Sequence, residues 1–153
     1  MRITDALLGE HAVLYDLFAT LRDIAGRGGE IAEIRGAILV LERLLVAHAR
    51  VEEELLFPAL EPHLGQIGPL MVMRAEHRGI DDLLEAARVE SDPSALRATI
   101  TELLDLAAGH FAKEERALFP MARRFLDEAT LTALGDRWAQ RRAVAVDAAG
   151  CGG

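Results

Sequence analysis

The chain has 153 residues and a net charge of −8, and 51% of its residues are hydrophobic although only 5% are aromatic. That size is most economically one domain, whose folding buries about two-thirds of the surface of the unfolded chain. The negative charge, without any dense cluster of Lys and Arg, argues against a nucleic-acid partner. The single cysteine, Cys151, excludes an intramolecular disulfide and any metal site built from several cysteines.

Membrane insertion and export are not expected from the hydropathy pattern. No uninterrupted apolar run approaches the 18 residues of a membrane span. Residues 1–11 lack the apolar segment of a signal peptide. We therefore expect a cytoplasmic protein with no membrane partner.

Apolar residues recur at helical spacing in four long stretches and one short stretch. Segments rich in Gly and Pro separate them, and such short connections favour antiparallel neighbours. The sequence therefore predicts an all-α protein, an up-down-up-down four-helix bundle with a short fifth C-terminal helix. We assign the bundle to residues 1–146 and a flexible Gly-rich tail to residues 147–153. The predicted helices span about residues 4–25, 31–60, 70–89, 93–125 and 131–144.

Capping residues and internal prolines mark several expected helix boundaries. Asp92 followed by Pro93 is typical of a helix N-terminus, and Thr130 is the expected cap of the fifth helix. Pro58 and Pro120 lie inside the second and fourth patterns. Because proline lacks a backbone N–H and clashes with the preceding turn, each should kink or end its helix.

One phrase occurs twice in the chain. Residues 48–58 read HARVEEELLFP, and residues 110–120 read HFAKEERALFP. A shorter phrase, Glu-His with Asp-Leu further along, begins at residue 10 and again at residue 76. The copies are offset by 62 residues (48 to 110) and 66 residues (10 to 76). The chain therefore resembles an internal repeat of one helical hairpin, with two histidines and an acid in each copy.

Four histidines and two glutamates fall on the predicted core faces of the long helices. Two pairs have His-x3-Glu spacing, which puts both side chains on one face of a helix. Burying a carboxylate without a partner is costly, and a metal removes that cost. Imidazole and carboxylate are common ligands of iron, manganese and zinc. The candidate metal ligands are His11, the pair His48 and Glu52, His77, and the pair His110 and Glu114.

This ligand set predicts a pair of metal ions. Two glutamates from different helices could bridge two ions about 3.5–4 Å apart, each ion also taking histidines. Six side chains leave positions on such a pair where water, oxygen, peroxide or another small ligand could bind.

The motifs, in this order, resemble the hemerythrin-like family, the HHE cation-binding domains, over roughly residues 5–125. The resemblance implies a four-helix bundle that holds two iron ions in an oxo- or hydroxo-bridged non-heme di-iron centre. It implies Glu52 and Glu114 as bridging carboxylates and the four histidines as terminal ligands. It also implies binding of, or reaction with, small oxidants or gases such as peroxide, oxygen or nitric oxide.

The chain departs from the oxygen-carrying hemerythrins at two positions. Those proteins have His-x3-His on the third helix, whereas Met73 stands four residues before His77 here. They have His-x4-Asp on the fourth helix, whereas Glu114 follows His110 at the closer spacing here. These departures favour peroxide, oxygen or nitric oxide chemistry, or sensing, over oxygen transport.

Other functions stay open or are excluded on sequence. The alternative is an iron- or gas-responsive sensor or metal-binding module without turnover, which would need a separate partner protein. An enzyme would instead need an electron donor that the sequence does not identify. Zinc or manganese in the same site stays open. The Glu-x-x-His motif of ferritin-like carboxylate proteins and the His-Glu-x-x-His motif of zincins are both absent.

Residues beside the ligands have two readings each. The acids that follow Glu52 and Glu114 are rotated about 100° from them, so they should lie at the surface or just outside the ligands. The acids that precede His11 and His77 should face outward or orient a neighbour. A phenol lies four residues after His11 and could be a hydrogen-bond donor or a redox-active group. An acid lies four residues after His77 and could be an extra ligand or a hydrogen-bond acceptor. Cys151 is read as a tail thiol or a redox group. The acids that follow the ligand glutamates are Glu53 and Glu115, and the acids that precede the histidines are Glu10 and Glu76. The phenol is Tyr15 and the acid four residues after His77 is Asp81.

Overall fold

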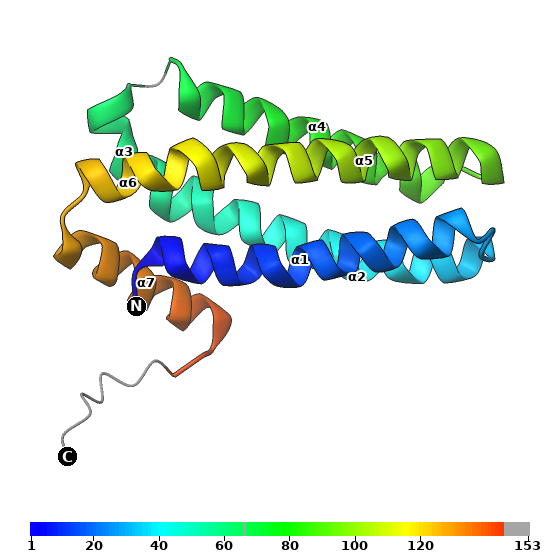
Figure 1. Ribbon diagram of the computed structural model, residues 1–153, viewed down its shortest axis with the longest axis horizontal. Coiled ribbons are helices and arrows are strands. Elements are labelled where there is room, and N and C mark those ends of the chain that lie inside the picture. Colours follow the sequence, from blue (N-terminus) through cyan, green and yellow to red (C-terminus); the bar gives the residue numbers. More distant parts are fainter. Residues whose placement is uncertain (66, 146–153) are drawn as a thin grey trace.

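The computed structural model describes residues 1–65 and 67–145, and every regular element in that part is helical. Four long helical segments lie side by side along the longest axis (Figure 1). Two of these segments contain a short π-helical stretch. The elements are α1 (Ile3–Gly26), α2 (Ile31–Val51), η1 (Glu52–Leu56), α3 (Phe57–Leu64), α4 (Pro69–Val89), α5 (Pro93–Lys113), η2 (Glu114–Leu118), α6 (Phe119–Phe125) and α7 (Glu128–Arg142).

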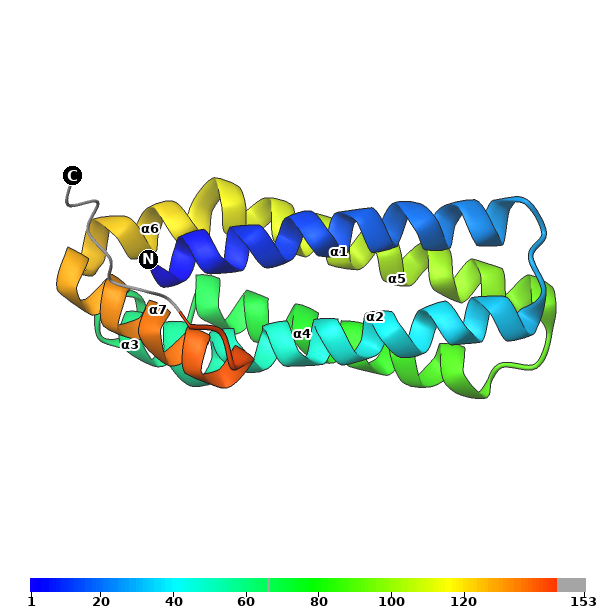
Figure 2. The same ribbon diagram turned by 90° about the horizontal axis from the view of Figure 1, so that it is seen from below.

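The helices alternate in direction along the chain, which confirms the predicted all-α, up-down-up-down bundle. Figure 2 shows α1 and α5 in one layer and α2 and α4 in the other. Contacts run around the bundle from α1 to α2, α2 to α4, α4 to α5 and back to α1. The fifth helix, α7, packs on the outside of α1 near the N-terminus (Figure 1). None of the described helices is long and apolar enough to span a membrane.

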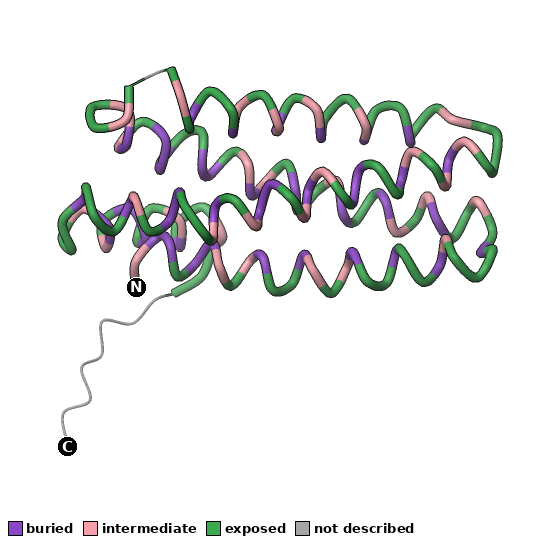
Figure 3. The backbone as a smooth tube through the Cα atoms, turned by 45° about the horizontal axis from the view of Figure 1, so that its top comes forward, coloured by how far each residue is buried: buried purple, intermediate pink, exposed green. Residues whose placement is uncertain are grey.

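The core consists of two apolar clusters that occupy opposite ends of the bundle. Figure 3 shows buried positions recurring along each long helix between exposed ones, as an amphipathic pattern requires. One cluster is centred on residues such as Phe18, Ile38 and Leu103, and the other on residues such as Leu7 and Phe57. Along every long segment the predicted metal ligands lie between the two clusters. The candidate site is therefore sealed by apolar side chains on two sides.

Pro58 and Pro120 each follow a π-helical stretch of five residues. In each stretch the N–H after it bonds the carbonyl of its first residue, from Phe57 to Glu52 and from Phe119 to Glu114. The wider turn accommodates a proline at the start of the next helix, where its missing N–H costs little. The sequence predicts that each proline kinks or ends its helix. The helical segments continue beyond Pro58 and Pro120 after a π turn, so neither proline ends its segment.

The structure confirms one predicted cap and corrects the other. The Asp92 side chain accepts a hydrogen bond from the Ala95 N–H at 2.7 Å, as predicted. Thr130 is not the cap of α7, because the Asp127 carboxylate accepts the Thr130 N–H at 2.8 Å. The last helix therefore begins at Glu128, three residues earlier than predicted. The predicted tail, residues 147–153 with Cys151, lies outside the described residues.

The assignment of helix faces is tested by two Leu→Ala substitutions. Leu103 is fully buried at 0% exposure, whereas Leu39 is 55% exposed. We expect Leu103→Ala to lower the free energy of unfolding by about 2–5 kcal/mol, because it leaves a cavity. Leu39→Ala should lower it by less than about 0.5 kcal/mol. Denaturant titration of metal-free protein measures both, and equal losses would contradict the assigned faces.

Candidate metal centre

The structure brings the six predicted ligands together at the middle of the bundle. None of them exposes more than 5% of its surface. His11 comes from α1, His48 from α2, His77 from α4 and His110 from α5. Glu52 and Glu114 are the first residues of η1 and η2. The two repeats therefore contribute equivalent residues to one shared site.

The six side chains form two overlapping clusters. One contains His11 and His48 and the other contains His77 and His110, and both include Glu52 and Glu114. In each cluster the potential ligand atoms lie within 4.8 Å of one another. The two Nε2 atoms are 3.2 Å apart in the first cluster and 3.0 Å apart in the second. Each cluster is thus the size of a single ion site.

The two glutamates face both clusters at once. Glu114 Oε2 lies 3.2 Å from His11 Nε2, while its Oε1 lies 3.1 Å from His110 Nε2. Glu52 Oε2 lies 3.3 Å from His77 Nε2 and 3.6 Å from His48 Nε2. A carboxylate placed in this way can serve two cations together, as bridging carboxylates do in two-metal sites.

A second ring of carboxylates fixes how each imidazole is protonated. Every one of the four histidines has its Nδ1 atom within hydrogen-bond distance of a glutamate oxygen from a different helical segment. An ionised carboxylate only accepts hydrogen bonds, so each Nδ1 must carry the proton. In the neutral ring the Nε2 lone pair then points into the site. The pairs are His11 with Glu115 (2.9 Å), His48 with Glu10 (2.8 Å), His77 with Glu53 (2.9 Å) and His110 with Glu76 (3.0 Å).

The inner atoms of the site fit a metal. The four carboxylate oxygens of Glu52 and Glu114 are buried and have no hydrogen-bond partner among the described residues. They face Nε2 atoms that, in neutral rings, also offer only lone pairs. Such an arrangement is repulsive unless positive charge lies between the groups. Nitrogen and oxygen donors with two negative charges match the ligand preferences of first-row transition metals.

Protons are the competing source of positive charge. Burial disfavours the charged form of His77, but the closely placed Glu52 carboxylate outweighs it and raises the pKa of His77 to about 9. Burial raises the pKa of Glu52, and the charge of Glu114 raises it further. Burial would also raise the pKa of Glu114, but the closely placed His11 and His110 imidazoles reverse that effect and lower it. Metal binding at neutral pH should therefore release protons.

The hydrogen-bond partners of the four outer glutamates were the part of the site that the sequence predicted least well. Glu10 and Glu76 do orient a neighbour, which was one of their two readings. Glu53 and Glu115 lie just outside the ligands, as one of their two readings had it, but their histidine partners could not be named. The available signal was the acid beside every predicted ligand pair, in the Glu-His and Glu-Glu doublets.

Tyr15 and Asp81 lie close to the site in different ways. The Tyr15 hydroxyl donates to Glu115 Oε1 at 3.3 Å, so it supports the carboxylate that holds His11. Burial, followed by the charge of Glu115, raises the pKa of Tyr15 to about 12, which keeps the phenol protonated at neutral pH. Asp81 lines a narrow cavity of about 10 Å³ beside His77. Its predicted role as an extra ligand stays a prediction.

Comparison with known families agrees with this geometry. The model of the hemerythrin HHE cation binding domain matches residues 2–122. The chain belongs to this family. The resemblance in the sequence is thereby confirmed, and α7 lies beyond the matched residues.

Curated relatives match a smaller part of the chain. The iron-sulfur cluster repair protein YtfE of Enterobacter sp. (strain 638) is 33% identical over 98 residues, which cover 56% of this chain and 44% of that protein. The proteins of the same name from Escherichia coli (strain K12 / DH10B) and Shigella boydii serotype 18 are 32% identical over the same shares. The chain thus spans less than half the length of these relatives. No solved structure matches significantly.

Loss of a shared carboxylate should impair both clusters. In Glu114→Gln one of two inner negative charges is removed with little change of shape, so we expect the metal retained after reconstitution to fall at both positions. The loss of affinity should be at least as large as the about 10–100-fold typical for an outer partner. Elemental analysis after gel filtration measures the metal. The exposed Glu102 of α5, the helix that leads into η2, supplies the control Glu102→Gln, and equal metal content in both variants would contradict the site.

An outer glutamate can be tested against its immediate neighbour. Glu53→Gln should weaken metal binding about 10–100-fold, because the amide no longer holds the Nδ1–H of His77 as firmly. Glu54 is exposed and pairs with Arg141 instead, so Glu54→Gln should bind metal like the parent. Competition with a calibrated chelator gives both affinities. A reversed order would show that Glu53 does not act on the site.

Proposed function

We propose that this protein holds a non-heme di-iron centre that binds or reacts with small oxidants or gases such as oxygen, peroxide or nitric oxide. The observation that carries the proposal is the sharing of two buried carboxylates between two histidine pairs. Such sharing suits two cations and leaves few protein donors for each. The proposed metal ligands are the six buried residues of the two clusters, His11, His48, Glu52, His77, His110 and Glu114.

The small size of the cavity beside the site supports a small ligand. A cavity of about 10 Å³ lies between α2, α4 and α5, and its lining includes His48, His77 and His110. That volume is close to the least that holds one water molecule. Ala49 and Asp81 form part of the same lining. A substrate much larger than one water molecule would require the helices or the lining side chains to move apart, which favours the smallest ligands.

The chain's own residues would hold and protect the iron pair. Glu52 and Glu114 supply the shared negative charge, and the outer glutamates keep a proton on each Nδ1. Phe111 stacks on the His11 ring with centroids 4.0 Å apart, which helps to exclude water from that side. When bound, iron would supply the redox chemistry and the open coordination positions.

Two other functions would use the same site. Iron-sulfur cluster repair is the activity in the name of the YtfE relatives, and here it would require release of iron to an acceptor protein. This chain matches less than half of those proteins, so that activity would have to reside in the shared part. A sensor or metal-binding module would instead bind its ligand without turnover and act through a partner protein.

Metal analysis with a single addition of oxidant separates these functions. We expect anaerobically reconstituted protein to hold about two irons per chain and to gain near-ultraviolet absorption once added hydrogen peroxide has oxidised the ferrous pair. Turnover of further peroxide to water should then release oxygen. Two irons whose spectrum responds to peroxide or nitric oxide without turnover would favour the sensor. Transfer of iron to a cluster-free iron-sulfur protein would favour repair. Zinc in place of iron, or no metal, would contradict the di-iron proposal.

A further inference from the structure

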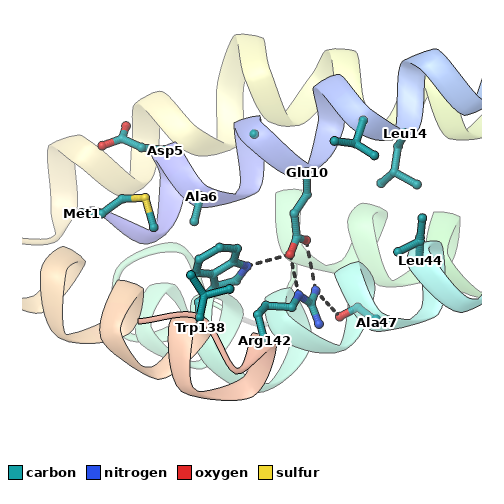
Figure 4. A pocket seen from close by; sticks show the side chains of 12 residues that line it. Met1, Asp5, Ala6, Glu10, Leu14, Leu44, Ala47, Trp138 and Arg142 are labelled. Carbon is teal, nitrogen blue, oxygen red and sulfur yellow. Dashed lines mark hydrogen bonds and ion pairs between the residues drawn. The ribbon is translucent and has the colours of Figure 1, made fainter. Parts of the chain in front are cut away.

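The last described helix reaches one of the outer glutamates. Figure 4 shows Trp138 and Arg142 of α7 pointing at Glu10 of α1. Trp138 Nε1 donates to Glu10 Oε1 at 2.7 Å. Arg142 donates from Nε to Oε1 at 2.6 Å and from Nη2 to Oε2 at 3.1 Å. We call Trp138 and Arg142 the α7 clamp.

The clamp is also anchored to the helix that carries a proposed ligand. Arg142 Nη2 donates to the backbone carbonyl of Ala47 at 3.0 Å, and Ala47 directly precedes His48. Glu10 Oε2 in turn accepts the Nδ1–H of His48 at 2.8 Å. A continuous series of hydrogen bonds therefore links α7 to the His11–His48 cluster. Both oxygens of Glu10 take part in it.

The internal repeat explains why this half of the site needs a clamp. Glu76 is the repeat equivalent of Glu10, and it is held by Lys113 from within the bundle. The residue equivalent to Lys113 in the first repeat, 62 positions earlier, is the buried apolar Val51. The first half of the bundle therefore has no cation at that position. The α7 clamp supplies the missing donors from outside the repeat.

Close packing keeps α7 in a defined position. A Cβ atom added at Gly135 would lie 2.0 Å from the carbonyl oxygen of Met1, so only glycine allows this approach of α7 to the N-terminus. Trp138 also packs against the apolar cluster around Leu7. The donors of the clamp are thus presented by a fixed helix, which limits the rotamers open to Glu10.

Water competes with the α7 clamp for hydrogen bonds to the Glu10 carboxylate. Glu10, Trp138 and Arg142 form part of the wall of an open cavity of about 550 Å³ between α1, α2 and α7. If a donor is lost, water from this cavity can take its place on the carboxylate. Glu10 would then be free to turn away from His48.

We propose that Trp138 and Arg142 are positioning residues for the His11–His48 half of the metal centre and act on it through Glu10. The inference rests on the metal centre proposed above. It makes the two halves unequal, because one half depends on a helix that lies beyond the family match and the other does not. The α7 clamp is therefore expected to slow the release of the metal ion held by His11 and His48.

Release of iron from the loaded protein tests the clamp. The variants are Trp138→Phe, Arg142→Gln and their combination, with Arg141→Gln as the matched control, because Arg141 pairs with Glu54 instead. The protein is loaded with ferrous iron without oxygen and mixed with a coloured ferrous chelator. We expect the double variant to release one iron per chain about 10-fold faster, with the second iron released at the parent rate. Glu53→Gln should accelerate the other iron.

A conservative variant distinguishes positioning from general loosening. Arg142→Lys can still donate to Glu10, so it should restore most of the slow release. Unchanged release from the double variant would overturn the clamp, as would equal acceleration of both irons accompanied by earlier thermal loss of helix. Failure of the parent protein to retain iron would overturn the metal centre and, with it, the clamp. A parent that retains iron and a double variant that releases it at the same rate would overturn the clamp alone.

Discussion

The organisation of this protein depends on the placement of two carboxylates opposite four imidazole lone pairs in a dry interior. Glu52 and Glu114 have no hydrogen-bond partner among the described residues, and apolar clusters close the site along the bundle at both ends. Such a layer would oppose folding unless cations or protons occupied it. Apolar burial at the two ends of the bundle therefore stabilises the fold, whereas the buried polar layer at its centre destabilises it when no cation is bound.

The outer glutamates turn this layer into a defined donor set. Each of them fixes one proton on a histidine and so directs the other nitrogen inward. The charge of Glu10 is itself secured: burial would raise its pKa, but hydrogen bonds from His48 and from α7 lower it to about 2. The metal preference thus arises from a double ring of side chains, in which the outer members come from neighbouring helices.

The sequence was sufficient to predict the fold and the clustering of the six candidate ligands, because both follow local periodicity. His48 and Glu52 share a helix face by spacing alone, and the repeat at His110 and Glu114 points to a single symmetric site. The π turns could not be predicted, since the hydrogen-bond shift before Pro58 depends on packing of the whole segment. The partners of Glu53 and Glu115 lie on other helices, so no spacing within one helix identifies them.

The central claim is that two metal ions share Glu52 and Glu114 between the two histidine pairs. Anomalous diffraction at the iron edge from crystals of the iron-loaded protein tests it most directly. We predict two peaks about 3.5–4 Å apart, one beside each pair of Nε2 atoms, with a glutamate reaching both. A single peak, or peaks outside the ring of six ligands, would contradict the account.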